Sequence, residues 1–336
     1  MRKPFAAAAL IVTCLASGAH ATSWDTPPPP WESPQPNIIP LPGMIEPHFE
    51  VGARYWWSEG KTKFSINSSK IDPTLGNPTS TLTYADVQGN TAEFVFRARN
   101  EGNFFAKGFV GGGFLNGGTL DDRDFFAGQV MFSDTGSHLD GNYLAYGTLD
   151  IGKRFELRRG MTKVTFGPFI GFNLWQEEMQ ANGARCKPDD VGGTFCGPAG
   201  STVVPFSTKV ITDQAGWAAL RLGAELQIKL FDRFTLIGDA AALPITYLVN
   251  NDSHHLRKDL GPIPNIEDTG PGWGYQLEAA MRVDLTPCWS LGTGVRYWFA
   301  EATNDESSFV HLNVNSELSN FTSQRFGVFG DFSYRF

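Results

Sequence analysis

Two of the six histidines in this 336-residue sequence lie in one short polar segment, "NNDSHH" (residues 250–255). Neighbouring residues of a β-strand point to opposite sides, so in an extended chain Asp252 and His254 share a side and His255 turns away. A carboxylate so placed can orient an imidazole and make it a stronger base, which suits general-base catalysis. Adjacent histidines suit metal chelation poorly, and no metal site is predicted.

A second segment, "DDRDFF" (residues 121–126), places two carboxylates by the same rule. Asp122 and Asp124 share a side of an extended chain, roughly 7 Å apart. Two like charges at that separation should raise the pKa of at least one group, and they can hold a water molecule. Aspartate and histidine are also common in solvated loops, so the spacing alone leaves a purely structural interpretation open for both segments.

β-Strands must hold these pairs, because alternation of apolar and polar residues recurs along the chain. The last segment, "RFGVFGDFSYRF" (residues 325–336), places Phe326, Val328 and Phe332 on one side and Asp331 on the other. Such a strand is typical of outer-membrane barrels, which have apolar lipid-facing residues and a polar interior. Nine further segments complete the pattern, near 48–57, 92–99, 104–115, 142–153, 163–175, 217–229, 234–248, 272–285 and 289–299.

The sequence therefore predicts an all-β fold, a ten-stranded antiparallel transmembrane β-barrel in the cell outer membrane. A closed barrel leaves no unpaired strand edge in hydrocarbon. Short periplasmic turns should alternate with five long extracellular loops, predicted at 58–80, 116–140, 176–212, 249–272 and 300–323. The two polar segments fall in the second and fourth of these loops, after strands three and seven, so they should face each other across the extracellular mouth.

The ends of the sequence and its cysteines place the chain in an oxidising compartment. Residues 1–21 have the basic start, apolar run and small-residue cleavage site of a signal peptide, and the proline-rich segment 22–46 should form a periplasmic N-terminal segment before the barrel at 47–336. Without residues 1–21 the chain has 25 basic and 35 acidic residues, which argues against nucleic acid as a partner. Cys186 and Cys196 bracket a polar loop and are predicted as a candidate disulfide.

Four segments resemble motifs of the omptins, the ten-stranded outer-membrane proteases of Gram-negative bacteria. The likeness runs from about residue 49 to residue 336, and the segments occur in the family's order. "SEGKTKF" (58–64) resembles S-G-K-T-K-E, "DDRDF" (121–125) resembles V-D-Q-D-W, "SDTGSHLD" (133–140) resembles T-D-E-S-R-H-P-D, and "NNDSHH" (250–255) resembles D-N-D-E-H.

This resemblance implies an aspartic-type endopeptidase in which Asp122 and Asp124 face an Asp252–His254 dyad; Asp134 matches a further aspartate of the family. His254 would take a proton from a water held by the aspartate couple, and the water would attack a peptide carbonyl without a metal or a covalent intermediate. Activity should be lost in acid, where His254 is protonated. The resemblance also implies peptide or protein substrates outside the cell, and lipopolysaccharide as an activating lipid in place of a chemical cofactor.

Two departures from the family concern its substrate pocket. Phe64 stands where the first motif ends in glutamate, and Asn250 stands where the fourth begins with aspartate. The family's cleavage between basic residues is linked to these acidic positions, and a basic side chain would be desolvated without a partner here. Dibasic specificity is therefore not expected unless Glu59 substitutes, and an apolar or otherwise different target is expected instead.

Two further hypotheses describe a barrel that is not an enzyme. The altered pocket favours a structural or adhesive surface protein. A diffusion pore is disfavoured, because ten strands enclose a narrow lumen in which inward arginines such as Arg54 and Arg296 should form ion pairs. Trp57, Trp273 and Trp298 are predicted to belong to the aromatic girdle at the membrane surface, which any such barrel would have.

Overall fold

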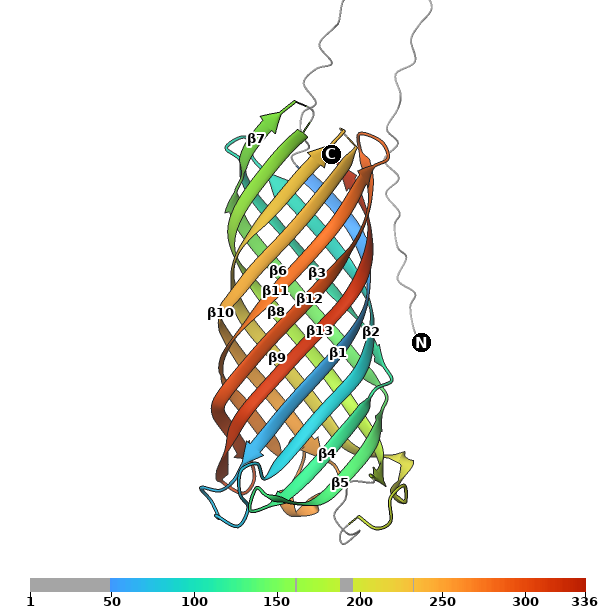
Figure 1. Cartoon of the computed structure of the whole chain (residues 1–336), viewed down its shortest axis with the longest axis vertical. Coiled ribbons are helices and arrows are strands. Elements are labelled where there is room, and N and C mark those ends of the chain that lie inside the picture. The colour runs from blue at the N-terminus through green and yellow to red at the C-terminus, as the bar shows by residue number, and fades with distance from the viewer. Residues whose placement is uncertain (1–48, 161, 188–195, 232) are drawn as a thin grey trace, which may run out of the picture. The chain divides into compact units, whose positions relative to one another are not determined.

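The structure is a computed structural model that describes residues 49–160, 162–187, 196–231 and 233–336, without the side chains of residues 159 and 304. The predicted signal peptide (1–21) and proline-rich segment (22–46) lie outside the described residues. In the described ranges, no helix is long and apolar enough to span a membrane. These ranges hold one short 3-10 helix, Lys258–Leu260, and thirteen strands (Figure 1): β1 (Phe49–Asn67), β2 (Ser80–Arg99), β3 (Phe104–Asn116), β4 (Thr119–Phe126), β5 (Val130–Leu139), β6 (Asn142–Lys153), β7 (Phe155–Arg159), β8 (Thr162–Cys186), β9 (Thr202–Leu230), β10 (Phe234–His254), β11 (Ile266–Asp284), β12 (Trp289–Phe309) and β13 (Val314–Arg335).

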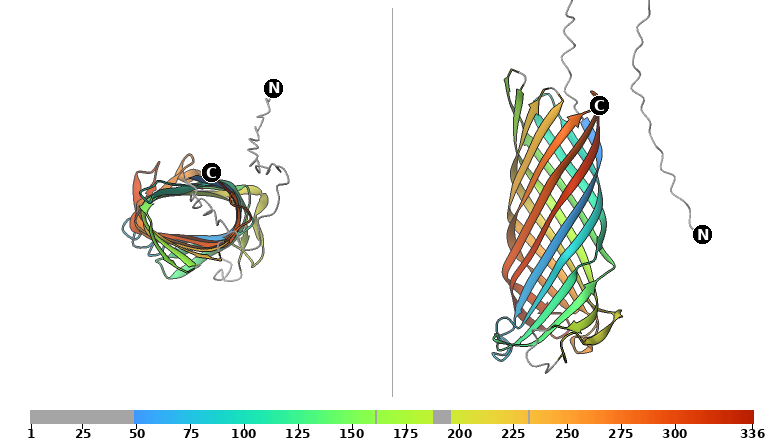
Figure 2. Two further views of the ribbon diagram at one scale, coloured as in Figure 1. Left: turned by 90° about the horizontal axis from the view of Figure 1, so that it is seen from above. Right: turned by 45° about the vertical axis from the view of Figure 1, so that its right-hand side comes forward.

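The strands close into one antiparallel ring. β1 pairs with β2 on one side and with β13 on the other, so the first and last strands seal the sheet. The view along the barrel in Figure 2 shows this ring. The predicted closed antiparallel barrel is confirmed. Its thirteen described strands occupy ten positions around the ring, because β3 and β4 both pair with β2, and β5, β6 and β7 all pair with β8.

Two glycines separate β3, which matches the third predicted strand, from β4, which lies in the second predicted loop. Gly117 and Gly118, between β3 and β4, have φ angles of +62° and +98°. Side chains other than hydrogen are strained in this left-handed region, whereas glycine enters it freely. The chain can therefore leave the sheet at this point and return to it as β4.

The predicted extracellular loops are mostly strand, which corrects their expected extents. β1 continues to Asn67, the hairpin of β4 and β5 occupies most of 116–140, and β10 continues to His254. The predicted loops began where lipid-facing apolar residues end, but backbone pairing does not end there. Short turns near 100–103 and 285–288 lie at the other end of the barrel, as predicted for the periplasmic side. The short turn predicted at 155–161 is instead largely strand, since β7 (Phe155–Arg159) pairs with the start of β8.

The outward face of the barrel changes from apolar to polar along each strand. On β1 the outward residues from Phe49 to Trp57 are apolar, and the next outward residues are Glu59, Lys61 and Lys63. Large apolar side chains that face outward are stable in lipid and not in water. The chain is therefore an outer-membrane β-barrel, and its walls continue past the lipid at the extracellular end.

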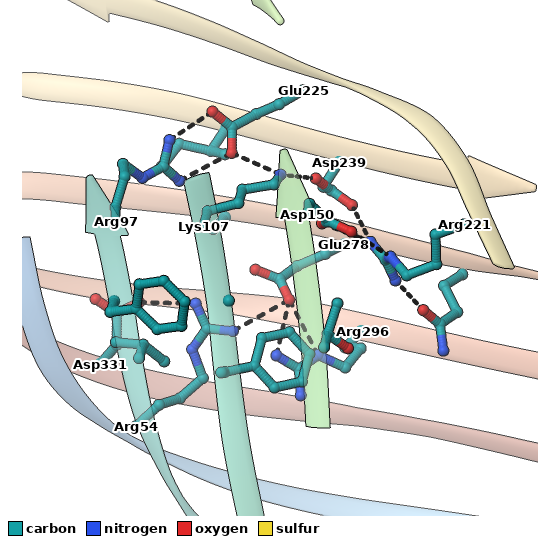
Figure 3. Close-up of a pocket in the computed structure, with 18 of the residues that line it drawn as sticks. Arg54, Arg97, Lys107, Asp150, Arg221, Glu225, Asp239, Glu278, Arg296 and Asp331 are labelled. Atoms are coloured by element: carbon teal, nitrogen blue, oxygen red, sulfur yellow. Dashed lines mark hydrogen bonds and ion pairs between the residues drawn. The ribbon is translucent and has the colours of Figure 1, made fainter. Parts of the chain in front are cut away.

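Ion pairs fill the barrel interior at the level of the apolar belt, some between adjacent strands and others between strands far apart in the ring (Figure 3). Arg296 of β12 contacts Glu93 of β2 at 2.5 Å and Glu278 of the adjacent strand β11 at 2.9 Å. Arg97 of β2 pairs with Glu225 of β9 at 2.6 Å. These pairs confirm the prediction of a charged, filled lumen. The cavity left among them measures about 80 Å³, which disfavours a diffusion pore.

Aromatic side chains fill the interior between this network and the extracellular end. The ring centroid of Trp298 lies 5.0 Å from those of Trp56 and Tyr146. Trp57 and Trp273 face outward, as expected of an aromatic girdle, with 41% and 49% of their surfaces exposed. The same prediction is wrong for Trp298, which is 2% exposed, because even-numbered residues of β12 point into the barrel.

Replacing Arg296 with methionine should destabilise the barrel by about 3–5 kcal/mol, because Glu93 and Glu278 would then share the single cation of Arg54 and one buried negative charge would be left uncompensated. The measurement is urea unfolding of the barrel folded in lipid vesicles. Lys70→Met is the control, since Lys70 pairs with Glu317 at 2.6 Å while 76% of its side chain is exposed, and its loss should change stability by less than about 1 kcal/mol. Equal effects of the two variants would contradict this account of the interior.

Candidate active site

The two polar segments lie on opposite walls at the end of the barrel away from β7 (Figure 1). β4 carries Asp122 and Asp124, and β10 ends with Asp252 and His254. Three strands, β5, β8 and β9, separate β4 from β10 around this end of the sheet. In a ring of ten, that separation places the two pairs nearly opposite each other.

Asp252 and His254 form a hydrogen-bonded dyad, with Asp252 Oδ2 lying 2.9 Å from His254 Nε2. Asp252 is fully buried, whereas the His254 side chain keeps 18% of its surface exposed. The amide of Asn265 fixes the end of the strand, since it accepts from the His254 N–H at 3.0 Å and donates to the His254 carbonyl at 3.1 Å. His254 Nδ1 is then the ring nitrogen available to take a proton from a water.

His255 faces away from the dyad, as predicted. Its Nε2 lies 2.9 Å from Thr212 Oγ1 on the neighbouring strand. Among the described residues, no group of three or more histidine, cysteine, aspartate or glutamate side chains is placed to hold a metal ion.

Asp122 and Asp124 form the opposite wall of the site. Ser80 Oγ donates a weak hydrogen bond to Asp122 Oδ1 at 3.5 Å. Burial and the neighbouring charge of Asp124 raise the pKa of Asp122 to about 7, and burial raises the pKa of Asp124. The Asp124 charge acts on the pKa of Asp122 in the direction predicted for two close carboxylates, and near neutral pH the couple can keep one proton.

A single cleft joins the two walls. Asp122, Asp124 and His254 all line one cavity of about 640 Å³ at the extracellular end. The charge of His254 acts on both aspartates, lowering the pKa of each, while their net shift remains upward. The structure thus brings the sequence-predicted residues together across an opening large enough for part of a peptide.

The electrostatics of the dyad differ from the expectation for an isolated histidine. Burial disfavours the charged imidazolium, but the Asp252 carboxylate outweighs burial and raises the pKa of His254 to about 9. Asp122 across the cleft acts in the same direction as Asp252. At neutral pH the resting site therefore holds a protonated His254.

An acidic layer beneath the dyad is a feature that sequence reasoning missed. In the register of the sheet, Asp213 of β9 lies opposite Asp252 of β10, and Asp268 of β11 lies opposite Asn250 of β10. All four side chains are fully buried. Asn250 Nδ2 donates to Asp213 Oδ1 at 2.8 Å and to Asp268 Oδ2 at 3.0 Å. Burial and the Asp252 charge raise the pKa of Asp213 well above its usual value. The layer follows from the register of β10 with β9 and β11, which the sequence alone does not specify.

The two altered pocket positions are both enclosed. Phe64 is fully buried, with its ring stacked on Phe321 at 4.9 Å and on Tyr84 at 6.4 Å. The side-chain amide of Asn250 donates its hydrogen bonds to the two aspartates of the acidic layer, Asp213 and Asp268. Glu59 does not substitute for a pocket carboxylate, because it is exposed on the outward face of β1.

Asp134 and the cysteines stabilise the hairpin that carries the aspartate couple. Asp134 of β5 is fully buried and pairs with Arg123 Nε at 3.2 Å, on the face of β4 opposite to Asp122. Cys186 and Cys196 form a disulfide, and Cys186 is the cross-strand partner of Thr135 on β5. Asp134 therefore supports the wall of the site instead of lining the cleft.

No protein-family model matches the sequence, and neither does any curated protein compared with it. Among solved structures, the outer membrane protease OmpT from Escherichia coli is similar over 87% of this chain and 98% of that chain, with a TM-score of 0.64 and 11% sequence identity. The fold is that of an outer-membrane β-barrel. The outer membrane protein OprG from Pseudomonas aeruginosa aligns over the same shares of each chain at 10% identity, with a TM-score of only 0.35. At such identities the similarity establishes the fold alone.

Replacing Asp252 with asparagine should lower the pKa of His254 from about 9 toward the usual 6.5 of histidine, because the carboxylate charge that opposes burial is removed. A histidine-labelled sample titrated by NMR measures this value directly. The control is Asp259→Asn, which removes a carboxylate that pairs with Arg257 outside the dyad. An unchanged His254 titration in the Asp252 variant would contradict the dyad.

Proposed function

We propose that the chain is an outer-membrane endopeptidase of the omptin type that cleaves peptides or proteins outside the cell. The observation that carries this proposal is the one cleft lined by Asp122, Asp124 and His254, with Asp252 buried behind the histidine. The order of the four omptin-like motifs and the likeness of the fold to OmpT support it. Lipopolysaccharide is proposed as the activating lipid.

The reaction begins with a water held between His254 Nδ1 and the Asp122–Asp124 couple. The carboxylates accept hydrogen bonds from the water and orient it, and the imidazole takes one of its protons as the oxygen bonds to the carbonyl carbon. The buried Asp252 carboxylate stabilises the imidazolium that forms. When the C–N bond breaks, the imidazolium returns the proton to the leaving nitrogen, so the dyad ends in its starting state.

Activity depends on the fraction of His254 that is neutral. Since the pKa of His254 is raised to about 9, the neutral fraction increases as the pH rises from 7 toward 9. Below neutral pH the neutral fraction becomes smaller still. The loss of activity in acid expected from an ordinary histidine should therefore begin at a higher pH. Substrate binding that displaces water from the cleft would add to the desolvation of the imidazolium and favour the neutral base.

The folded barrel should cleave a mixed-sequence peptide library between about pH 7 and 10, with and without lipopolysaccharide. Asp122→Ala and His254→Ala should each reduce the rate by at least about 100-fold, the range expected for loss of a water-orienting group or a general base. His138→Ala, which removes an exposed histidine of β5, is the matched control and should change little. Absence of cleavage by a correctly folded wild type would favour the non-enzymatic surface barrel.

The walls of the cleft support an apolar substrate. Apart from the proposed catalytic groups they are formed largely by aliphatic and aromatic side chains, among them Ile66, Leu82, Phe125, Leu256 and Phe309. A basic substrate side chain would be desolvated against these walls and compensated only by the aspartates that hold the water. An apolar side chain would instead gain from leaving water. We therefore propose cleavage next to aliphatic or aromatic residues.

Leu256→Glu should increase cleavage next to lysine and arginine by about tenfold relative to cleavage next to leucine, because it places a carboxylate in the cleft wall. Leu256 is half exposed, so the fold should tolerate the change. Leu256→Gln separates charge from polarity, and Leu312→Glu adds the same charge at an exposed position that does not line the cleft. Wild-type cleavage confined to basic residues would reject the apolar specificity while leaving the protease itself intact.

A further inference from the structure

A second cavity, of about 130 Å³, lies at the periplasmic end of the barrel interior. Strand ends and turns form it, including the start of β1, the turn at Arg154, the start of β8 and the ends of β9, β11 and β13. Seven basic side chains line this cavity, but only two acidic ones, Glu50 and Asp284. Its lining therefore holds more positive than negative side chains, unlike the ion-pair network in the middle of the barrel.

Each of the two lining carboxylates is already shared between two cations. Glu50 contacts Arg282 at 2.7 Å and Arg335 at 3.2 Å. Asp284 contacts Lys229 at 3.1 Å and again Arg335 at 2.7 Å. Three cations therefore share these two carboxylates. The other four lining cations share two more, Arg97 and Arg154 with Glu225, and Arg99 and Lys163 with Glu156, so seven cations around the cavity are paired with four carboxylates.

Two guanidinium groups of the lining also keep donors without acceptors. The Nε atoms of Arg154 and Arg282 are buried and have no hydrogen-bond partner, and both side chains are 10% exposed. Arg154 contacts Glu225 at 3.6 Å, and that carboxylate already pairs with Arg97 and Lys107. Buried charged donors are costly when unsatisfied, and an oxyanion supplies several acceptors at once.

We propose that this cavity binds a small oxyanion of the phosphate type that enters from the periplasm. Its volume corresponds to a few water molecules at about 30 Å³ each, which suits a phosphate and excludes an acyl chain. Arginine and lysine bind such anions by complementary means, through forked donors and through a compact charge. The site lies at the end of the barrel opposite to the proposed catalytic cleft and does not depend on it.

Isothermal titration of the folded full-length barrel with inorganic phosphate and with pyrophosphate, at constant ionic strength, tests this proposal. Wild type should bind one anion saturably. The double variant Arg154→Gln/Lys163→Gln should weaken binding by at least about tenfold, because two charge-assisted contacts are removed. Lys229→Gln, at a side chain that is 30% exposed, provides a milder lining variant if the double variant folds poorly.

The matched control is Lys153→Gln/Arg233→Gln, which removes the same charge from the same end of the barrel at positions that do not line the cavity. An equal loss in this control would show that the rim attracts anions without a site and would overturn the proposal, as would the absence of saturable binding. A short-chain phosphatidylglycerol forms the third arm. Preference for that lipid over free phosphate would reject a soluble anion as the ligand.

Discussion

Closure of the backbone hydrogen-bond ladder is the constraint on which the rest of the structure depends. Hydrocarbon offers no water to satisfy a backbone N–H or C=O group, so each strand in the lipid needs a neighbour on both sides. β1 and β13 supply the last of these neighbours, with pairs running from Glu50 and Arg335 to Asn67 and Glu317. The pairing continues past the apolar belt, and the ladder that lipid requires therefore also builds the walls of the cleft.

The barrel interior separates groups of opposite charge into layers. The arginines of the central network neutralise Glu93 and Glu278, whereas Asp213 and Asp268 beneath the dyad are bridged by the neutral amide of Asn250. Trp56 and Trp298 lie between these layers, and the guanidinium of Arg296 rests on the Trp56 ring at 4.8 Å. This separation keeps the negative charge of the aspartates at the cleft close to His254, where it raises the pKa of the imidazole.

Rigid strands, not loops, present the chemistry of the proposed site. Asp122 is held by pairing of β4 with β2 and β5, and Asp252 by pairing of β10 with β9 and β11. Groups fixed in this way lose little freedom when a substrate binds, which favours catalysis by positioning. The fold shared with OmpT at 11% identity shows that the side chains of the walls can vary while the ladder is kept.

The sequence by itself determined the barrel, its closure, the outward belt and the pairing of Asp252 with His254, because these follow from a period of two along a single strand. The sequence also predicted the correct number of strands between the segment with Asp122 and Asp124 and the segment with Asp252 and His254. It did not determine the length of the extramembrane walls, where outward residues become polar and the lipid-facing pattern ends while backbone pairing continues. Only the tertiary structure placed Asp213 and Asp268 beneath the dyad, turned Trp298 inward and raised the pKa of His254. Each of these depends on register between strands and on burial, and both arise from contacts between residues far apart in the chain.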